Sequence, residues 1–96
     1  MINRYHIFVE GRVQGVGFRG FCMSHALEHG LTGSVRNLEN GLVEIFIQGE
    51  EADCKKFLLD VQKGDRFIRV DNISVKKTAV DPKEKKFRYE FGGWGW

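Results

Sequence analysis

A glycine-rich segment near the N-terminus has the composition of an anion-binding loop. Residues 11–20 have the sequence GRVQGVGFRG, which holds four of the twelve glycines of the chain. The segment joins an expected strand to an expected helix, where unpaired backbone N–H groups and the positive end of the helix dipole favour an anion. Since glycine lets a backbone close tightly, the loop is predicted to bind a phosphate-like group.

Arg19 is the charged side chain at the expected start of this helix. A cation at a helix N-terminus is unfavourable by roughly 0.3–1 kcal/mol, and no Asp or Glu occurs between Glu10 and Glu28 to offset that energy. A phosphate bound in the loop would offset it. The residues alone leave the alternative open, a flexible loop whose glycines only form a turn and whose Arg19 points to solvent.

The loop does not match the common nucleotide-binding loops. A Walker A loop needs GxxxxGK[ST], and residues 11–20 contain no lysine. Gly15, Gly17 and Gly20 do fit GxGxxG, but the parallel βαβ unit and the acidic ribose-binding residue are missing. We therefore do not expect nucleotide binding.

Asn37 and Asn40 are both candidates for positioning a reactant. Asn40 precedes Gly41, and this dipeptide predicts a tight hairpin turn with positive φ angles. Asn37 lies in an expected strand, where asparagine is disfavoured. Its place in a strand therefore calls for another reason, which makes it the stronger candidate for a functional role, the alternative being a polar side chain on an edge strand that faces water.

Two histidines and two cysteines could also carry chemistry. His25 and His29 are four residues apart on the expected helix and could share a metal, but we find no third ligand and no HExxH pattern, so we expect surface or boundary histidines. Cys22 could be an activated thiol near a helix N-terminus, although its place on an apolar stripe with Ala26 favours core packing. Cys22 and Cys54 match no metal-ligand spacing and are expected to be buried thiols in a reducing cytoplasm.

The elements that position these residues follow a βαββαβ order. Aromatic and β-branched runs indicate strands, and apolar residues at a period of 3.6 indicate helices, one of which is expected to bury Cys22, Met23, Ala26 and Leu27. We expect an α+β fold, a ferredoxin-like sandwich in which an antiparallel sheet of four to five strands carries two helices on one face. The expected strands are 5–9, 34–38, 42–48, 67–76 and 86–91, and the expected helices run from 18 or 19 to about 29 and from 50 to near 64.

Length and composition exclude several classes of protein. The chain of 96 residues is 42% hydrophobic and 29% charged, so it is expected to fold as one domain over 1–96. Residues 92–96, GGWGW, either fold back onto this domain or form a flexible tail. The net charge of +2 is far from that of a nucleic-acid binder. With no signal peptide and no apolar run of membrane length, we expect a cytoplasmic monomer that binds neither nucleic acid nor membrane.

Two motifs carry a resemblance to a known family. GRVQGVGFR at 11–19 resembles the phosphate-binding signature of the acylphosphatase family, and GSVRNLENGLVEIFIQG at 33–49 resembles its second motif. Both motifs occur in the order and with the spacing that the family has. The length of the chain and the order of its elements also agree, so the resemblance covers essentially the whole chain. Ser34 departs from the family pattern, which usually has an aromatic residue there, and Leu38 differs from the animal enzymes.

The resemblance implies hydrolysis of an acyl phosphate, a mixed carboxylic–phosphoric anhydride, to a carboxylate and inorganic phosphate. It implies no cofactor and no metal, a small-molecule acyl phosphate as substrate, and inorganic phosphate as product and competitive inhibitor. The residue matching Asn37 orients the attacking water in that family. The residue matching Arg19 binds the phosphoryl oxygens together with loop amides, here those of Gln14, Gly15, Val16, Gly17 and Phe18.

Other functions of βαββαβ proteins are less compatible with the sequence. An RNA-recognition domain would carry several aromatic residues on its third strand, whereas LVEIFIQ at 42–48 has only Phe46. A metal carrier would need a CxxC loop. A similar module also begins a large carbamoyl-transfer maturation protein, and the end of the chain at residue 96 favours the free-standing enzyme.

Overall fold

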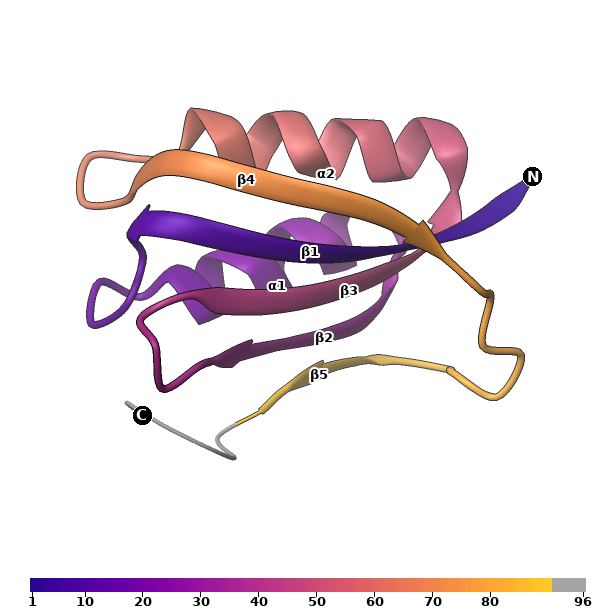
Figure 1. Cartoon of the computed structure of the whole chain (residues 1–96). Helices are drawn as coiled ribbons and strands as arrows, with labels where there is room; N and C mark the ends of the chain where they lie inside the picture. The colour runs from indigo at the N-terminus through magenta and orange to yellow at the C-terminus, as the bar shows by residue number, and fades with distance from the viewer. Residues whose placement is uncertain (91–96) are drawn as a thin grey trace.

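The computed structural model describes residues 1–90, which form two helices and five strands (Figure 1). The expectation for residues 92–96 lies outside the described residues. No described helix has the length and apolarity needed to cross a membrane. The elements follow the predicted order with modest shifts of their ends: β1 (Ile2–Arg12), α1 (Phe18–Glu28), β2 (Thr32–Asn37), β3 (Val43–Glu50), α2 (Glu51–Lys63), β4 (Arg69–Thr78) and β5 (Phe87–Tyr89).

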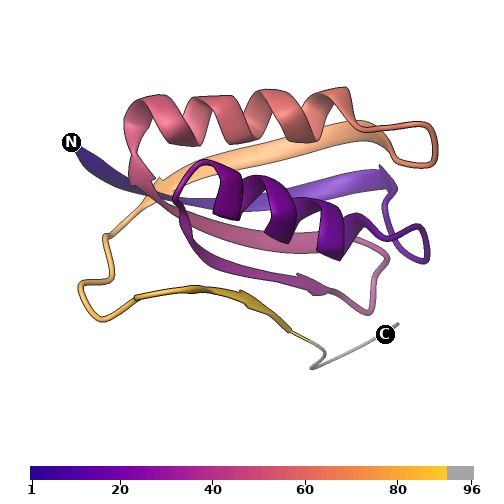
Figure 2. The same cartoon turned by 180° about the vertical axis from the view of Figure 1, so that it is seen from behind.

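The strands form one sheet in the order β4-β1-β3-β2-β5, and both helices cover the same face of it (Figure 2). The α+β, ferredoxin-like prediction is confirmed. Strands β1 to β4 pair antiparallel, as predicted, whereas β5 pairs parallel with β2, so the sheet is mixed. The parallel pairing follows because β4 ends at the end of the sheet where β2 begins, and the chain then enters β5 in the direction of β2.

The core lies between the sheet and the helices. In β1, β2 and β3 every second side chain points toward the helices, as the two-residue period of a strand requires. Helix α2 contributes Cys54, Phe57 and Val61, which are fully buried. The strands and α1 contribute the other large buried side chains: Ile7, Val9, Val35, Val43, Ile45, Ile47, Phe18 and Cys22.

The predicted apolar face of α1 is partly wrong. Helix α1 buries a row at four-residue spacing, Phe18, Cys22 and Ala26, whereas the Leu27 side chain is 58% exposed. Leu27 follows Ala26 by one residue, about 100° around the helix, which turns it out of the row that contacts the sheet.

The turn between β2 and β3 is a tight hairpin turn, as predicted, but the positive φ angle expected at Asn40 is absent. The N–H of Leu38 donates to the Leu42 carbonyl at 2.8 Å, and the N–H of Gly41 donates to the Leu38 carbonyl at 3.1 Å. Of the described residues in the turn only Gly41 has a positive φ, 93°, which is typical of a three-residue loop. Asn40 acts in the turn as expected, because its side-chain oxygen accepts the N–H of Leu42 at 3.1 Å.

Gly33 allows β2 to lie against β3. Its φ is +143°, and a Cβ atom built there would lie 1.8 Å from the Phe46 carbonyl oxygen. No side chain fits that space without separating the two strands. This glycine therefore determines how closely β2, the strand that ends at Asn37, packs on the centre of the sheet.

The substitution Gly33→Ala is expected to lower the free energy of unfolding by about 3 kcal/mol or more, because it adds backbone strain and a clash with a neighbouring strand. Chemical denaturation checks the change. Gly20→Ala is the matched control, since Gly20 lies in α1 and a Cβ there meets nothing within 4 Å. It is expected to raise stability by up to about 1 kcal/mol. Equal stability of the G33A protein and the parent would contradict this account of β2.

Candidate active site

A small hollow of about 80 Å³ lies where the β1–α1 loop meets the ends of β2 and β5. This volume suits a small anion and is well below the roughly 300 Å³ of sites for larger organic ligands. Among the described residues, its lining holds one cationic side chain and no carboxylate. The lining residues are Val13, Gly15, Gly17, Phe18, Arg19, Asn37 and Tyr89.

The structure brings together most of the residues that the sequence predicts for the site. Arg19 and Asn37 line the same hollow, together with Gly15, Gly17 and Phe18. They come from two segments far apart in the sequence, the β1–α1 loop with the start of α1, and the end of β2. Two predicted residues of the loop lie outside the lining, Gln14 and Val16.

The loop enters α1 through a left-handed turn at Gly17. Gly17 is the N-cap residue of α1, with φ 81° and ψ 17°, and its carbonyl accepts the N–H of Phe21 at 3.0 Å. No described side chain caps this helix, and its first turn contains no acidic residue. The first N–H groups of α1 are therefore oriented to receive an anion from outside the helix.

Gln14 and Val16 fix the loop from outside the hollow. The Gln14 side-chain amide donates to two backbone carbonyls of the β2–β3 turn, those of Leu38 and Leu42, each at 2.9 Å. Val16 packs against the core. The family resemblance implies that the backbone amide of Gln14 binds phosphate. The role of its side chain was not predicted, because it depends on contacts between residues 24 and 28 positions apart.

Tyr89 and the neighbouring backbone of β5 hold the Arg19 side chain at the hollow. The Arg19 guanidinium carbon lies 4.9 Å from the centre of the Tyr89 ring, a distance that permits a cation–π interaction. Its Nη1 atom donates to the Glu90 carbonyl at 3.3 Å. Sequence reasoning missed Tyr89, because only the parallel pairing of Val35 with Tyr89 places this aromatic ring beside the loop.

Asn37 is a buried polar residue at the end of β2. Its side chain is on the helix-facing side of the sheet, as is Val35 two residues earlier, and the residue is only 2% exposed. The strand that carries it is not an edge strand, because β5 pairs along its other side. The alternative of an edge-strand side chain facing water is therefore wrong.

Cys22 is part of the core, as the sequence favours. It is fully buried, and burial raises the pKa of its thiol well above the ordinary value. A thiol held in its neutral form is a poor nucleophile, so core packing is confirmed. Cys54 is also a buried free thiol.

His25 and His29 lie toward the other end of α1, away from the hollow. Both are partly buried, which confirms their prediction as boundary residues. The expectation that no further ligand is available is wrong, because Glu28 and Asp60 lie beside them. Asp60 belongs to α2 and is thirty-one positions beyond His29, a separation that no spacing rule for a metal motif covers.

Comparison with known proteins agrees with the geometry of the hollow. The family model described as Acylphosphatase matches residues 5–89. This chain belongs to the acylphosphatase family. The resemblance seen in the two sequence motifs is thereby confirmed, and so is the prediction of a hydrolase of this class.

Individual members of the acylphosphatase family are similar over nearly the full length of the chain. An acylphosphatase of Clostridium acetobutylicum is 48% identical over 92% of this chain and 97% of its own length. The crystal structure of acylphosphatase from Bacillus subtilis covers 95% of this chain and all of that chain, with 37% identity and a TM-score of 0.88.

A much larger protein contains a similar unit. Full-length HypF, in a structure described as phosphate- and nucleotide-bound, matches 99% of this chain but only 13% of its own length, with 32% identity and a TM-score of 0.86. The acylphosphatase fold thus occurs both as a chain of about this length and as a small part of a longer one.

Proposed function

We propose that this chain hydrolyses the carboxyl–phosphate bond of acyl phosphates in the 80 Å³ hollow. The observation that carries the proposal is that the Arg19 side chain and the buried Asn37 side chain line one small hollow with the glycine turn. A cation, backbone donors and a neutral amide are the groups that a phosphoryl-transfer site needs when its leaving group is good.

The phosphoryl group would bind in the loop. The amides of Gln14, Gly15, Val16, Gly17 and Phe18 surround the entry to α1, and the positive end of the helix dipole points the same way. Arg19 can donate two parallel hydrogen bonds to phosphoryl oxygens. The described lining residues include no acidic side chain, which would repel such an anion.

Asn37 would orient the attacking water on the side opposite the leaving group. The water oxygen forms a bond to phosphorus as the bond from phosphorus to the acyl oxygen breaks, and the carboxylate leaves with that electron pair. The water proton passes to an oxygen of the phosphate itself. A carboxylate leaves readily without a general acid. Most of the catalysis therefore comes from stabilising the negative charge of the phosphoryl group and from positioning the attacking water.

Tyr89 and Gln14 would serve as positioning residues. Tyr89 limits the directions that the Arg19 guanidinium can take, and Gln14 connects the loop to the turn that follows Asn37. Small displacements of such groups lower rates strongly, because the reacting atoms must be aligned. The two residues therefore connect the phosphate-binding loop to the strand that carries the water-binding amide.

A larger hollow elsewhere is a weaker candidate for the phosphate. It measures about 290 Å³ and has side chains of both charge signs. Its Glu84 carboxylate accepts hydrogen bonds from Arg4 at 3.1 Å and from Thr32 at 2.7 Å, which makes it part of the fold. Its lining residues are Asp81, Lys83, Glu84, Lys85, Lys86 and Arg88.

We also propose that the acylphosphatase acts as a cytoplasmic monomer without a cofactor. The described residues that line the 80 Å³ hollow include no imidazole, thiol or carboxylate to hold a metal. Two buried free thiols fit a reducing compartment.

The purified chain is expected to hydrolyse benzoyl phosphate without added metal. EDTA should leave the rate unchanged, and inorganic phosphate should raise KM without changing kcat, because product and substrate share the loop. Loss of benzoyl phosphate absorbance measures the reaction. A rate no higher than that of buffer alone would overturn the proposed function.

Arg19→Ala is expected to lower kcat/KM by about 10³-fold, because the transition state loses its cationic partner. Inhibition by inorganic phosphate should be lost in the same variant. Arg12→Ala is the matched control, since Arg12 lies in the same glycine-rich segment but is exposed and outside the lining of the hollow. Equal losses in R19A and R12A would show a general effect of charge rather than a phosphate ligand.

Asn37→Ala is expected to lower kcat by about 10²-fold, the scale for loss of one preorganised polar group. The inhibition constant for inorganic phosphate should change little, because Asn37 acts on the water and not on the phosphate. Asn40→Ala, in the nearby turn, should keep kcat. Full kcat in N37A, with its fold checked by circular dichroism, would refute the water-positioning role.

A further inference from the structure

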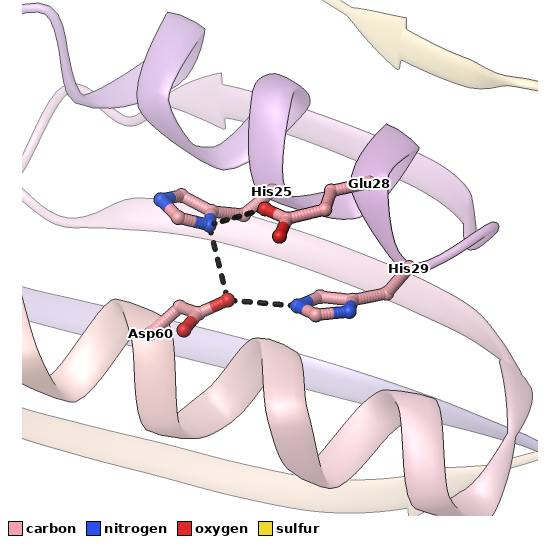
Figure 3. Close-up of side chains that lie close together, drawn as sticks. All are labelled: His25, Glu28, His29 and Asp60. Carbon is pink, nitrogen blue, oxygen red and sulfur yellow. Dashed lines mark hydrogen bonds and ion pairs between the residues drawn. The ribbon is translucent and has the colours of Figure 1, made fainter.

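A cluster of four metal-ligand side chains lies between the two helices (Figure 3). His25, Glu28 and His29 come from the last turn and the C-cap of α1, and Asp60 comes from α2. One nitrogen or carboxylate oxygen from each residue lies within 4.8 Å of all the others. Figure 3 shows the four side chains pointing toward one another.

The Asp60 carboxylate is the centre of this cluster. Its Oδ2 atom lies 2.8 Å from His29 Nε2 and 3.0 Å from His25 Nδ1. The Glu28 Oε1 atom lies 3.4 Å from the same His25 nitrogen. Positions i, i+3 and i+4 of a helix share one face, so α1 presents three ligands side by side and α2 supplies the fourth.

His25 Nδ1 is a buried ring nitrogen that makes no hydrogen bond with the described part of the chain. The protein encloses it, and it has no hydrogen-bond partner among the described residues, although two carboxylate oxygens lie within 3.4 Å. Both distances would allow a hydrogen bond, yet neither contact forms one. A cation placed among the four residues would receive its lone pair.

We propose that His25, Glu28, His29 and Asp60 form a binding site for a divalent transition-metal cation of the zinc class, which would join α1 to α2. Zinc binds imidazole nitrogen and carboxylate oxygen at about 2.0–2.2 Å, so tetrahedral ligands lie about 3.3 Å from one another. The separations of 2.8, 3.0 and 3.4 Å are close to that value. The other pairs of ligand atoms lie within 4.8 Å of one another, so they reach it with side-chain movements of up to about 1.5 Å.

The donor set and the local charge select the type of cation. Two imidazoles and two carboxylates suit zinc, cobalt or nickel, whereas magnesium and calcium prefer oxygen ligands alone. The Asp60 carboxylate faces both imidazoles and brings negative charge to the site. The negative end of the α1 dipole lies at the same place and favours a cation.

This site is independent of the proposed hydrolysis. The hollow with Arg19 is at the N-terminal end of α1, and the cluster is at its C-terminal end. The metal would stabilise the pairing of two helices and would not touch the substrate. Its test therefore uses spectroscopy and unfolding, so that a failure of the hydrolysis proposal leaves it intact.

Titration of the untagged, metal-free chain with Co²⁺ is the first measurement. We expect one equivalent to give the intense visible bands of tetrahedral cobalt, without a thiolate charge-transfer band, and Zn²⁺ to displace it. Mg²⁺ should have no effect. With free Zn²⁺ at 100 times its Kd, the unfolding equilibrium constant should fall about 100-fold. No saturable one-to-one binding of Co²⁺ or Zn²⁺ would overturn the proposal.

Variants locate the bound ion. His29→Gln and Asp60→Asn should each weaken Co²⁺ binding at least 10-fold and abolish the tetrahedral spectrum. His6→Gln is the matched control, since His6 also faces a carboxylate, Glu44 at 2.7 Å, but lies in β1 away from the cluster. Glu28→Gln serves if the other variants do not fold, because the Glu28 side chain is 64% exposed. Unchanged binding in folded H29Q or D60N, unchanged binding in E28Q where neither of those folds, or an equal loss in H6Q would refute the site.

Discussion

The proposed active site depends on how the chain passes from β1 to α1 within residues 13–17. The strand ends at Arg12 and the helix begins at Phe18, so the backbone must turn sharply and present its first helical N–H groups in the same short segment. Positive φ angles at Gly15 and Gly17, 75° and 81°, make that turn. The glycine requirement and the anion-binding geometry are thus consequences of one constraint.

Packing then holds this turn against the rest of the protein. Phe18 is only 1% exposed, so the start of α1 is anchored in the core while the next residue, Arg19, reaches the hollow. Gln14 attaches the loop to the β2–β3 turn. A site with few polar groups can be precise when each of them is held by a buried neighbour or by a backbone hydrogen bond.

The two ends of α1 have opposite electrostatic character, and each end carries side chains that suit an ion of a different sign. The N-terminal turn has no acidic residue and carries Arg19 beside the hollow, which matches a bound anion. The C-terminal turn carries His25 and Glu28 and meets Asp60, which matches a bound cation. Both arrangements follow the direction of the helix dipole, so one short helix organises the proposed anion site and the proposed cation site.

The sequence by itself determined the order of elements and the glycine turn, and its two family motifs pointed to Arg19 and Asn37. The elements and the turn follow from local rules, because helix and strand periods and turn glycines act over a few residues. Only the tertiary structure placed Tyr89 beside Arg19 and Asp60 beside His29. It also turned Leu27 outward. Such contacts join residues far apart in the chain or depend on which side of a helix meets the sheet, and packing of the whole core decides them.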